Sequence, residues 1–294
     1  MSDQPTAREI QQAVVNQYGA RARRVLESIG AAGATEACCT PAAPGNASAP
    51  QPIELTTISG SAEEACCGPD CCSTDAAPAG VGEASGQQYG SVLYPEADLS
   101  TLPESVVAAS AGCGNPLAIA ELSAGERVLD LGSGGGIDCF LAAQRVGEGG
   151  EVWGLDMTPD MVALARHNAD QVGATNVRFR LGEIEDIPFD GGSFDAIMSN
   201  CVINLSHDKP RVFREAFRVL KPGGRLRVSD MVWVGTAPTA TRDELESWAG
   251  CIAGALTVED YLGAIEAAGF VDVRAEYEGE AGQVTSASVF ARKP

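Results

Sequence analysis

Long apolar runs are missing from this chain. No stretch approaches the roughly 18 consecutive apolar residues that a membrane-spanning helix needs. The first residues also lack the basic start and apolar segment that together mark a secretory signal peptide. The 294 residues are 45% hydrophobic, which is enough to bury the core of one large domain. We therefore expect a cytoplasmic globular protein without a membrane partner.

Positive charge is scarce as well. The chain has 20 lysine and arginine residues against 40 aspartate and glutamate residues, so its formal net charge is −20. This negative field repels the phosphates of nucleic acids, and we expect no nucleic-acid partner. Only two histidines are present. His167 is expected on the polar side of a helix, whereas His207, in "NLSHDK", is either a general base or a loop and capping residue.

Cysteine, by contrast, is abundant, with ten residues. Four of them form the adjacent pairs of "CCGPDCC", and adjacent cysteines rarely bridge to each other because the geometry is strained. In a long chain without a signal peptide, such residues indicate free thiols, ligands of soft metals or redox groups. The cysteines therefore indicate thiol chemistry rather than a disulfide scaffold.

The first third of the chain divides into a helix and a linker. Apolar residues recur at helical spacing over residues 5–29, which predicts a helix and an N-terminal segment 1–29. Small and polar residues dominate from there to about residue 86, and large apolar side chains are few. We predict a flexible linker over residues 30–88, because such a composition cannot bury enough surface to offset the entropy of ordering.

Strands and helices alternate regularly after residue 103. Apolar strands are predicted at residues 127–131, 151–156, 177–181, 194–199 and 224–230. Helices are predicted at residues 137–146, 159–172, 209–220 and within 241–268. This alternation implies parallel β-α-β units in an open sheet with helices on both faces. The last two segments, 271–278 and 287–293, are predicted to close the sheet as an antiparallel pair.

A nucleoside site is predicted at the carboxyl end of this sheet. The glycine-rich "VLDLGSGGGID" follows the first strand and opens the first helix, where backbone comes close to a ligand and free N–H groups face it. Asp156 ends the second strand, and a carboxylate there accepts both hydrogen bonds of a ribose diol. The alternative is capping of the next helix, for which Thr158 is also available.

The segment "LGEIEDIPF" follows the third strand and suits the base of the same nucleoside. Ile184 is predicted to pack on an adenine ring, with Glu183 or Glu185 reaching its exocyclic amine. The alternative is a solvated acidic turn without a ligand.

Four motifs, "VLDLGSGGG", "GLDMT", "GEIEDIPF" and "RVLKPGGRL", occur in the order and spacing of the class I S-adenosylmethionine-dependent methyltransferases, which residues 103–294 resemble. The resemblance implies a Rossmann-like, seven-stranded, mostly parallel sheet with an antiparallel last strand, and S-adenosylmethionine as the methyl donor. The implied cofactor-binding residues are Asp130, Gly132, Ser133, Gly134, Asp156, Met157, Glu183, Ile184 and Asn200.

Three further cysteines lie near the expected acceptor side. Cys201 follows the fourth strand, Cys113 lies in a glycine-flanked turn before the sheet, and Cys251 follows the fifth strand. Three thiolates suit one soft, three-coordinate centre such as trivalent arsenic, whose remaining lone pair attacks a methyl carbon. For each cysteine alone, burial in the core is the alternative, as we expect for Cys139 on its apolar helix.

The motifs "SAGCGNP", "SNCVINLSHDK" and "GCIAGAL" resemble those of the arsenite S-adenosylmethionine methyltransferases of the prokaryotic type. The resemblance implies that Cys201 and Cys251 form the minimal arsenic-binding pair, with Cys113 as a third thiol or in a transient disulfide. It also implies methylation of arsenite delivered as a thiol conjugate, for arsenic detoxification, with thioredoxin or glutathione as reductant. The implied domains are a cofactor-binding core over 89–235 and an arsenic-binding, sheet-completing region over 236–294.

The N-terminal thiols remain ambiguous. Animal and algal relatives carry another cysteine shortly after a Tyr-Gly segment, and this chain has none there. The nearest cluster, Cys66, Cys67, Cys71 and Cys72, either captures arsenite, reduces Cys113 or has no catalytic part. We expect a monomer, because no interface signature is visible. Two alternative functions stay open: methylation of a small carbon or oxygen acceptor, indifferent to the cysteines, and thiol-based metalloid binding without methyl transfer.

Overall fold

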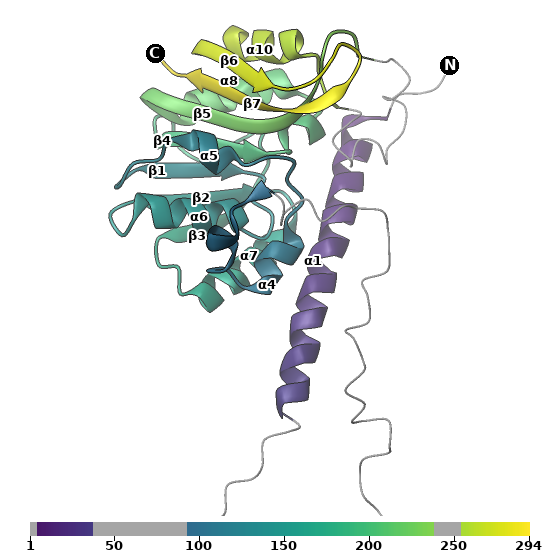
Figure 1. The fold of residues 1–294 in the computed structure, drawn as a ribbon, viewed down its shortest axis with the longest axis vertical. Helices are drawn as coiled ribbons and strands as arrows, with labels where there is room; N and C mark the ends of the chain where they lie inside the picture. The colour runs from purple at the N-terminus through teal and green to yellow at the C-terminus, as the bar shows by residue number, and fades with distance from the viewer. Residues whose placement is uncertain (1–4, 38–92, 238–253) are drawn as a thin grey trace, which may run out of the picture. The chain divides into compact units, whose positions relative to one another are not determined.

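The computed structural model describes residues 5–37, 93–237 and 254–294 (Figure 1). Contacts divide the chain into two compact units, one made of Met1–Ala32 with Gln88–Pro294 and the other of Gly33–Gln87. Most of the expected linker lies outside the described residues, so the predicted domain division stays a prediction. The fold below is that of the first unit.

The core is a seven-stranded sheet in the order β3-β2-β1-β4-β5-β7-β6. Its strands are β1 (Arg127–Leu131), β2 (Glu151–Asp156), β3 (Val177–Leu181), β4 (Phe194–Asn200), β5 (Leu220–Trp233), β6 (Val271–Tyr277) and β7 (Val284–Arg292). The pairs among β1 to β5 are parallel, and β7 is antiparallel to both β5 and β6. The predicted Rossmann-like architecture with an antiparallel last strand is therefore confirmed.

The helices of the described part lie either before β1, where there are four, or between strands. They are α1 (Ala7–Ala37), α3 (Glu96–Leu99), α4 (Glu104–Ala109), α5 (Pro116–Ala120), α6 (Ile137–Val146), α7 (Pro159–Val172), the 3-10 helix η1 (Ile203–Leu205), α8 (Lys209–Val219) and α10 (Val258–Ala267). Of the helical stretch predicted within 241–268, residues 241–253 lie outside the described part. The rest begins at Thr257, whose side chain accepts the Asp260 N–H and so caps α10.

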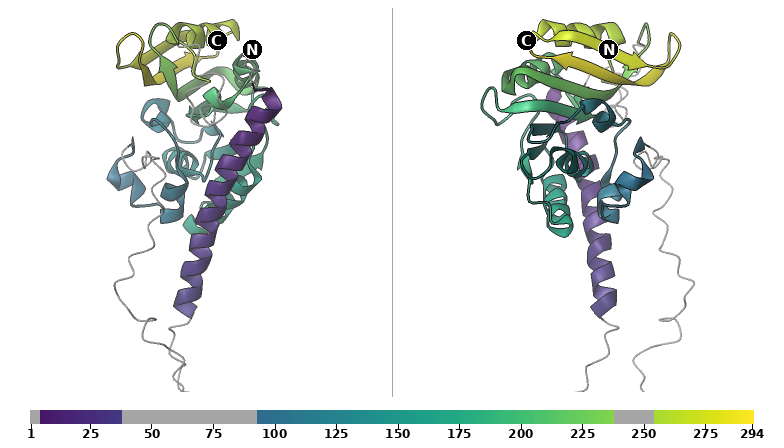
Figure 2. Two further views of the ribbon diagram at one scale, coloured as in Figure 1. Left: turned by 90° about the vertical axis from the view of Figure 1, so that its right-hand side faces the viewer. Right: turned by 60° about the vertical axis from the view of Figure 1, so that its left-hand side comes forward.

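Helices lie on both sides of the sheet (Figures 1 and 2), and an apolar cluster fills the space between sheet and helices on each face. Helices α8 and α10 pack on one face, where Phe213 and Tyr261 join a cluster with Leu129. Helices α4 to α7 cover the other face, where Phe140 joins a cluster with Val128. Neighbouring residues of β1 thus point to opposite layers, as the alternation of side chains along a strand requires. Both faces are buried, which explains the nearly continuous apolar strands in the sequence.

Helix α1 packs against α4 and α7 (Figure 1). Ala22 and Val25 share a buried cluster with Leu164 of α7, and Arg23 forms an ion pair with Asp160. Arg21 donates hydrogen bonds to the carbonyls of Ala108 (3.2 Å) and Ser110 (2.5 Å), just before the turn that holds Cys113. The helix predicted over residues 5–29 is confirmed, but it runs on to Ala37, so the expectation of a flexible linker from residue 30 is wrong for residues 30–37. The helix brings a remote part of the chain to the edge of the site.

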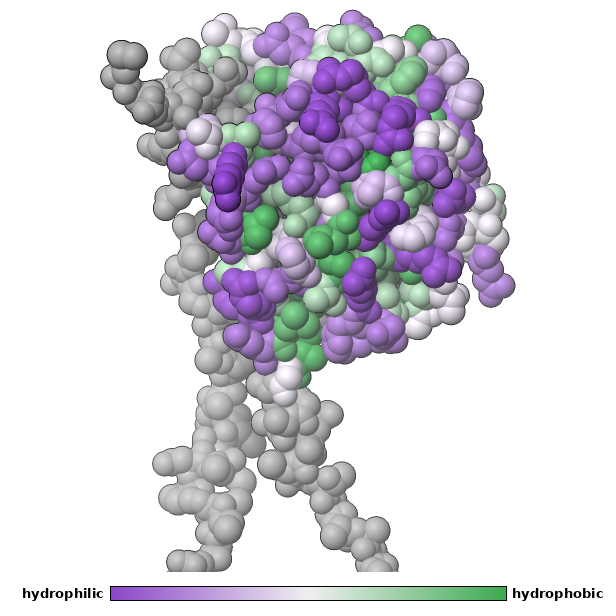
Figure 3. Space-filling view, turned by 180° about the vertical axis from the view of Figure 1, so that it is seen from behind, coloured by the Kyte–Doolittle hydropathy of each residue, from purple (hydrophilic) through white to green (hydrophobic). Residues whose placement is uncertain are grey.

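The outer surface is predominantly polar. Figure 3 shows a face dominated by hydrophilic residues with smaller hydrophobic areas between them. Among the described residues, the exposed large hydrophobic side chains are Leu181, Val271 and Tyr277, which lie on β3 and β6, the two edge strands. Within the described residues, no helix has the length and apolar content to cross a membrane.

Candidate functional site

A pocket opens at the carboxyl ends of β1, β2 and β4. It encloses about 950 Å³, including the solvent at its mouth. The predicted cofactor residues that line it are Gly132, Ser133, Gly134, Asp156, Met157, Ile184 and Asn200. Asp130 and Glu183 are not among the lining residues: Asp130 is buried below the glycine loop and Glu183 is exposed. The position matches the rule that open α/β sheets bind ligands beyond the carboxyl ends of their strands.

Asp156 holds the glycine loop against the start of α7. Its carboxylate accepts the Gly134 N–H (2.9 Å) on one oxygen and the Thr158 N–H (2.8 Å) on the other. Thr158 occupies the N-cap position of α7, but its own side chain makes no capping hydrogen bond. Burial raises the pKa of the Asp156 carboxyl, opposed by these hydrogen bonds. The Thr158 side chain also hydrogen-bonds this carboxylate, and the two oxygens together can still accept from a ligand in the pocket.

Ser133 carries a polar atom that the protein leaves unpaired. Its hydroxyl is buried and has no hydrogen-bond partner among the described residues. The loop itself is well fixed, because the N–H groups of Gly132 and Ser133 donate to the Leu155 carbonyl at 2.7 and 3.0 Å. Buried polar groups in native proteins nearly always have a partner. The orphaned hydroxyl therefore fits a polar ligand bound on the glycine loop.

Helix α1 supplies one wall of the pocket. Gln11, Val14 and Tyr18 line it together with the glycine loop. The spacing of apolar residues over 5–29 predicted this helix but not its place at the site. The helix and the glycine loop are far apart in the sequence, so no local pattern signals their contact.

Cys113 and Cys201 meet beside the pocket. A disulfide joins them across 88 residues of sequence, with a Cα–Cα distance of 5.7 Å. Cys201 is nearly buried and lines the pocket. Two of the three predicted arsenic-binding cysteines are thus adjacent. Cys251 and the N-terminal residues Cys66, Cys67, Cys71 and Cys72 lie outside the described residues, so their predicted roles stay predictions.

Asp230 of β5 faces the two sulfur atoms. Their Sγ atoms and a carboxylate oxygen of Asp230 all lie within 4.8 Å of one another. The carboxylate is fully buried and accepts hydrogen bonds from Tyr261 Oη and from the N–H groups of Asn204 and Met231, all at 3.0–3.1 Å. Burial raises its pKa to about 7. The sequence analysis missed Asp230, although the polar pair "SD" inside the apolar strand "RLRVSDMVW" was a usable signal.

Asp130 and Asp138 form a pair of buried carboxylates near the glycine loop. The Cys139 thiol donates to Asp130 (3.3 Å), and Tyr94 Oη donates to Asp138 (2.7 Å). Burial raises the pKa of Asp138 to about 6 and that of Asp130 well above its ordinary value. Cys139 is fully buried, as predicted, and burial also raises the pKa of its thiol, so it is an unreactive core residue. The sequence analysis did not identify Tyr94 or Asp138.

Glu185, rather than Glu183, reaches the pocket. Its carboxylate accepts a hydrogen bond from Ser206 Oγ, and His207 Nδ1 lies 3.8 Å from it. Helix α8 is capped by Asp208, whose side chain accepts the Arg211 N–H (3.0 Å), so His207 is not its cap.

Comparison with known proteins shows to which class of protein this fold belongs. Residues 122–269, half of the chain, match a family model described as "Methyltransferase domain". The glycine loop, Asp156 and Asn200 all lie within this segment. The fold and the pocket therefore define a methyltransferase domain.

Three relatives indicate the kind of methyltransferase to which this chain is similar. The arsenite methyltransferase of Halobacterium salinarum is 45% identical over 197 residues, or 62% of this chain and 50% of that protein. That of Aquipseudomonas alcaligenes is 44% identical over 183 residues, 60% of this chain and 52% of that protein. A crystal structure of an arsenic (III) S-adenosylmethionine methyltransferase from Chlamydomonas reinhardtii matches with a TM-score of 0.59 and 39% identity, covering 67% of this chain and 71% of that one. This chain belongs to the arsenite methyltransferase family, and it spans about half the length of the two curated relatives.

Proposed function

We propose that this protein binds trivalent arsenic through cysteine thiolates and methylates it with S-adenosylmethionine. The observation that carries the proposal is the meeting of Cys113 and Cys201, far apart in sequence, beside a pocket that Cys201 itself lines. The names of the relatives support the same reaction.

The residues of the pocket fit the methyl donor. Asp156 would hold the ribose, because it lines the pocket at the end of β2 and its two carboxylate oxygens can accept from hydroxyls as well as from the protein. Ser133 would pair its orphaned hydroxyl, and Ile184 would pack on the adenine. Glu183 or Glu185 would accept from the exocyclic amine, and Glu185 is the one that lines the pocket. When bound, S-adenosylmethionine supplies an electrophilic methyl group on a sulfonium.

The remaining proposed cofactor residues act around the methionine part. Gly132 and Gly134 bring the loop backbone close to the donor, and Met157 and Asn200 add side chains to the lining. Asp130 is buried and does not line the pocket, so its part in cofactor binding would be indirect.

The acceptor would be held by thiols. Reduction of the Cys113–Cys201 disulfide by thioredoxin or glutathione frees two thiols, and an arsenic(III) thiol conjugate exchanges onto them. Each new As–S bond replaces one bond to the conjugate, whose thiol leaves with the proton of the cysteine. Cys251 would add the third sulfur, and the lone pair left on arsenic is then the nucleophile.

Methyl transfer raises arsenic formally from the trivalent to the pentavalent state. The two electrons would come from the Cys113 and Cys201 thiolates that hold arsenic: both of their As–S bonds break and the two sulfurs join as the disulfide. Trivalent methylarsenic would stay on Cys251 and take up one free thiol with loss of one proton, and the external reductant would then reduce the disulfide. Cys66, Cys67, Cys71 and Cys72 are proposed to capture arsenite or to relay electrons. A monomer that detoxifies arsenic remains our working proposal.

Replacement of the pocket cysteine tests this function. We expect Cys201→Ser to lower arsenic methylation by at least about a hundredfold, because a hydroxyl is a poor ligand for a soft centre. Binding of S-adenosylmethionine should change less than about threefold, since the donor residues are untouched. The measurement is chromatography of arsenic products after incubation with arsenite, donor and thiol, with calorimetry for the donor.

The matched control is Cys139→Ser, a buried cysteine on α6 outside the proposed site, which should keep methylation within about threefold of the parent. Full methylation by Cys201→Ser would contradict thiol binding. Methylation of a carbon or oxygen acceptor, unchanged in that variant, would instead support the alternative of a thiol-independent methyltransferase.

A further inference from the structure

The amide of Asn200 ties the Cys113 turn to the end of β4. Its carbonyl oxygen accepts the N–H groups of Cys113 (3.1 Å) and Gly114 (3.2 Å). Its amino group donates back to the Gly114 carbonyl at 2.8 Å. Asn200 directly precedes Cys201 in the chain. One side chain therefore connects the backbone at one cysteine to the residue next to the other.

The turn fits its place without spare room. A Cβ atom added to Gly112 would overlap the Asn200 side chain, and one added to Gly114 would overlap that of Ser229 on β5. The glycines on either side of Cys113 thus allow the turn to lie between the ends of two neighbouring strands. Because glycine is also the most flexible residue, the turn needs an external contact to hold one conformation.

Cys201 is fixed from its own side. Its N–H donates to the Ser229 carbonyl (2.8 Å), which continues the pairing of β4 with β5. Its φ of +57° lies in the left-handed region, which is uncommon for residues other than glycine and is kept only where surrounding contacts enforce it. Since Cys201 is held by the sheet, the distance between the two sulfurs depends on where the Cys113 turn lies.

Two buried groups set the orientation of the Asn200 amide. Its amino group shares two hydrogens among three acceptors, namely the Gly114 carbonyl, Tyr94 Oη (3.0 Å) and Asp138 (3.3 Å), and Tyr94 Oη in turn donates to Asp138. An ionised carboxylate only accepts hydrogen bonds, so the amino side of the amide faces Asp138. The carbonyl side then faces the N–H groups of Cys113 and Gly114. Tyr94 and Asp138 are 4% and 5% exposed, so water competes little for these bonds.

We propose that Asn200 is a positioning residue that keeps Cys113 within bonding reach of Cys201 when both are reduced, with Tyr94 and Asp138 orienting its amide. Preorganisation of this kind raises the effective concentration of one thiol at the other, because the turn has already lost its conformational entropy before the sulfur–sulfur bond forms. This inference deepens the proposed function and rests on it, since arsenic binding is what the thiol pair would serve. The position of Cys113 relative to Cys201 can be tested without arsenic.

The test is the thiol–disulfide equilibrium of the full chain in glutathione buffers. Glutathione disulfide takes two electrons and two protons from the Cys113 and Cys201 thiols and leaves as two glutathione molecules. Differential alkylation and mass spectrometry of the two peptides report the effective concentration. We expect Asn200→Ala to lower it by about tenfold or more, from the loss of several buried hydrogen bonds, and Tyr94→Phe by about threefold, from the loss of one orienting partner.

Asn176→Ala is the matched control. That asparagine donates two hydrogen bonds of its own, to the carbonyls of Ala143 (3.2 Å) and Gly147 (3.0 Å), away from the cysteines. It should leave the equilibrium unchanged. A parental equilibrium in folded Asn200→Ala, or an equal shift in Asn176→Ala, would overturn the proposal.

If Asn200→Ala does not fold, Tyr94→Phe decides: a shift supports the proposal and a parental value overturns it. The assay contains neither arsenic nor methyl donor. If the parent chain fails to methylate arsenic but the Asn200 variant shifts the equilibrium, the proposed function is wrong and the positioning role stands. If the parent chain methylates arsenic but the variant shows no shift, the proposed function stands and the positioning role is wrong.

Discussion

At the scale of single residues, the Asp138 carboxyl lines the pocket and makes the stability of the fold depend on pH. It is 5% exposed, and burial raises its pKa to about 6, opposed by the hydrogen bonds from Tyr94 and Asn200. In the unfolded chain its pKa returns to an ordinary value near 3.9. The folded state therefore binds the proton more tightly, and this group stabilises the fold at low pH. That stability is lost as the pH rises through about 6.

Asp138→Asn should remove this pH dependence. Between pH 5 and pH 7 the parent chain should lose about 1 to 1.5 kcal/mol of unfolding free energy that the variant does not lose, because a proton retained only by the folded state changes stability by about 1.4 kcal/mol per pH unit. The measurement is urea denaturation of both chains across this range. Asp170→Asn, on the exposed side of α7, controls for the loss of one negative charge. Parallel pH profiles for the parent and Asp138→Asn would refute the assignment.

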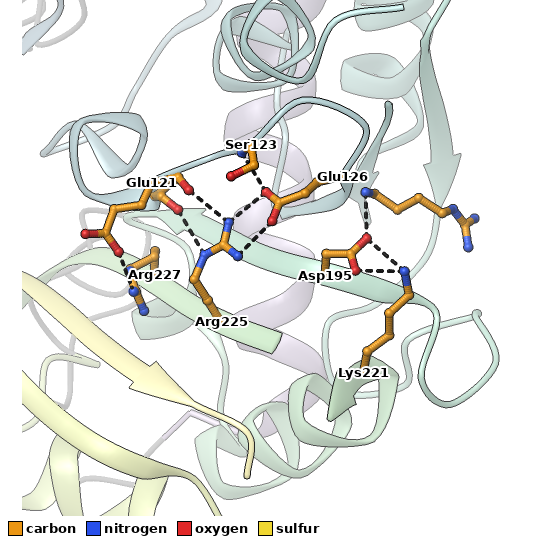
Figure 4. A network of polar contacts seen from close by, with 9 residues as sticks. Glu121, Ser123, Glu126, Asp195, Lys221, Arg225 and Arg227 are labelled. Atoms are coloured by element: carbon orange, nitrogen blue, oxygen red, sulfur yellow. Dashed lines mark hydrogen bonds and ion pairs between the residues drawn. The ribbon is translucent and has the colours of Figure 1, made fainter. Parts of the chain in front are cut away.

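At the scale of secondary-structure elements, the ends of the strands differ in character. The carboxyl ends form the pocket, whereas ion pairs connect β1, β4 and β5 at the opposite end (Figure 4). Arg225 donates to both carboxylate oxygens of Glu126, at 2.9 and 2.7 Å, and to the Glu121 carbonyl. Asp195 accepts the Arg127 N–H and pairs with Lys221. Asp195 thus links β4 to its neighbours β1 and β5, and Arg225 links β5 to the segment that leads into β1, two strands away.

Arg225→Met should lower the unfolding free energy by about 1 to 3 kcal/mol, because it leaves the Glu126 carboxylate largely buried without its partner. The side chains of Arg225 and Glu126 are only 20% and 16% exposed. Arg178→Met is the matched control, since that side chain is 58% exposed and pairs with Glu151 on the surface. Its cost should stay within about 0.5 kcal/mol. Denaturation curves of equal midpoint for the two variants would contradict the role of the network.

At the scale of the whole molecule, the net charge of −20 dominates the electrostatics. Like charges repel in the compact state more than in the expanded chain, so the charge destabilises the fold. Salt screens this repulsion, since the Debye length falls from about 10 Å at 0.1 M to about 3 Å at 1 M. Added salt should therefore stabilise the protein, unless attractive pairs outweigh the repulsion.

The melting temperature should rise between about 0.05 and 1 M sodium chloride, by about 2–4 °C for each kcal/mol of repulsion removed. A thermal shift series measures it, and potassium chloride should act equally if screening is the cause. A melting temperature that falls with salt would mean that ion pairs such as those of Figure 4 outweigh the net repulsion.

The agreement between sequence and structure follows the range of the interactions. Strands β1, β2 and β3 and helices α6 and α7 have the predicted bounds, because apolar periodicity, Pro159 and Gly147 act locally. Strand β5 is longer than predicted. It extends to Trp233 because β7 pairs with it as far as Val284, a contact between segments far apart in the chain.

Within the site, short patterns at the strand ends were enough to predict the glycine loop, Asp156 and the cysteine motifs, and they led us to expect Cys113 near Cys201. No local pattern contained the position of Asp230 opposite these cysteines or of α1 in the wall of the pocket. The tertiary structure alone decided both, and it likewise decided that Tyr94 and Asp138 orient Asn200. The physical reason is that burial and hydrogen bonding between distant segments depend on which strands become neighbours, and strand order is a property of the whole sheet.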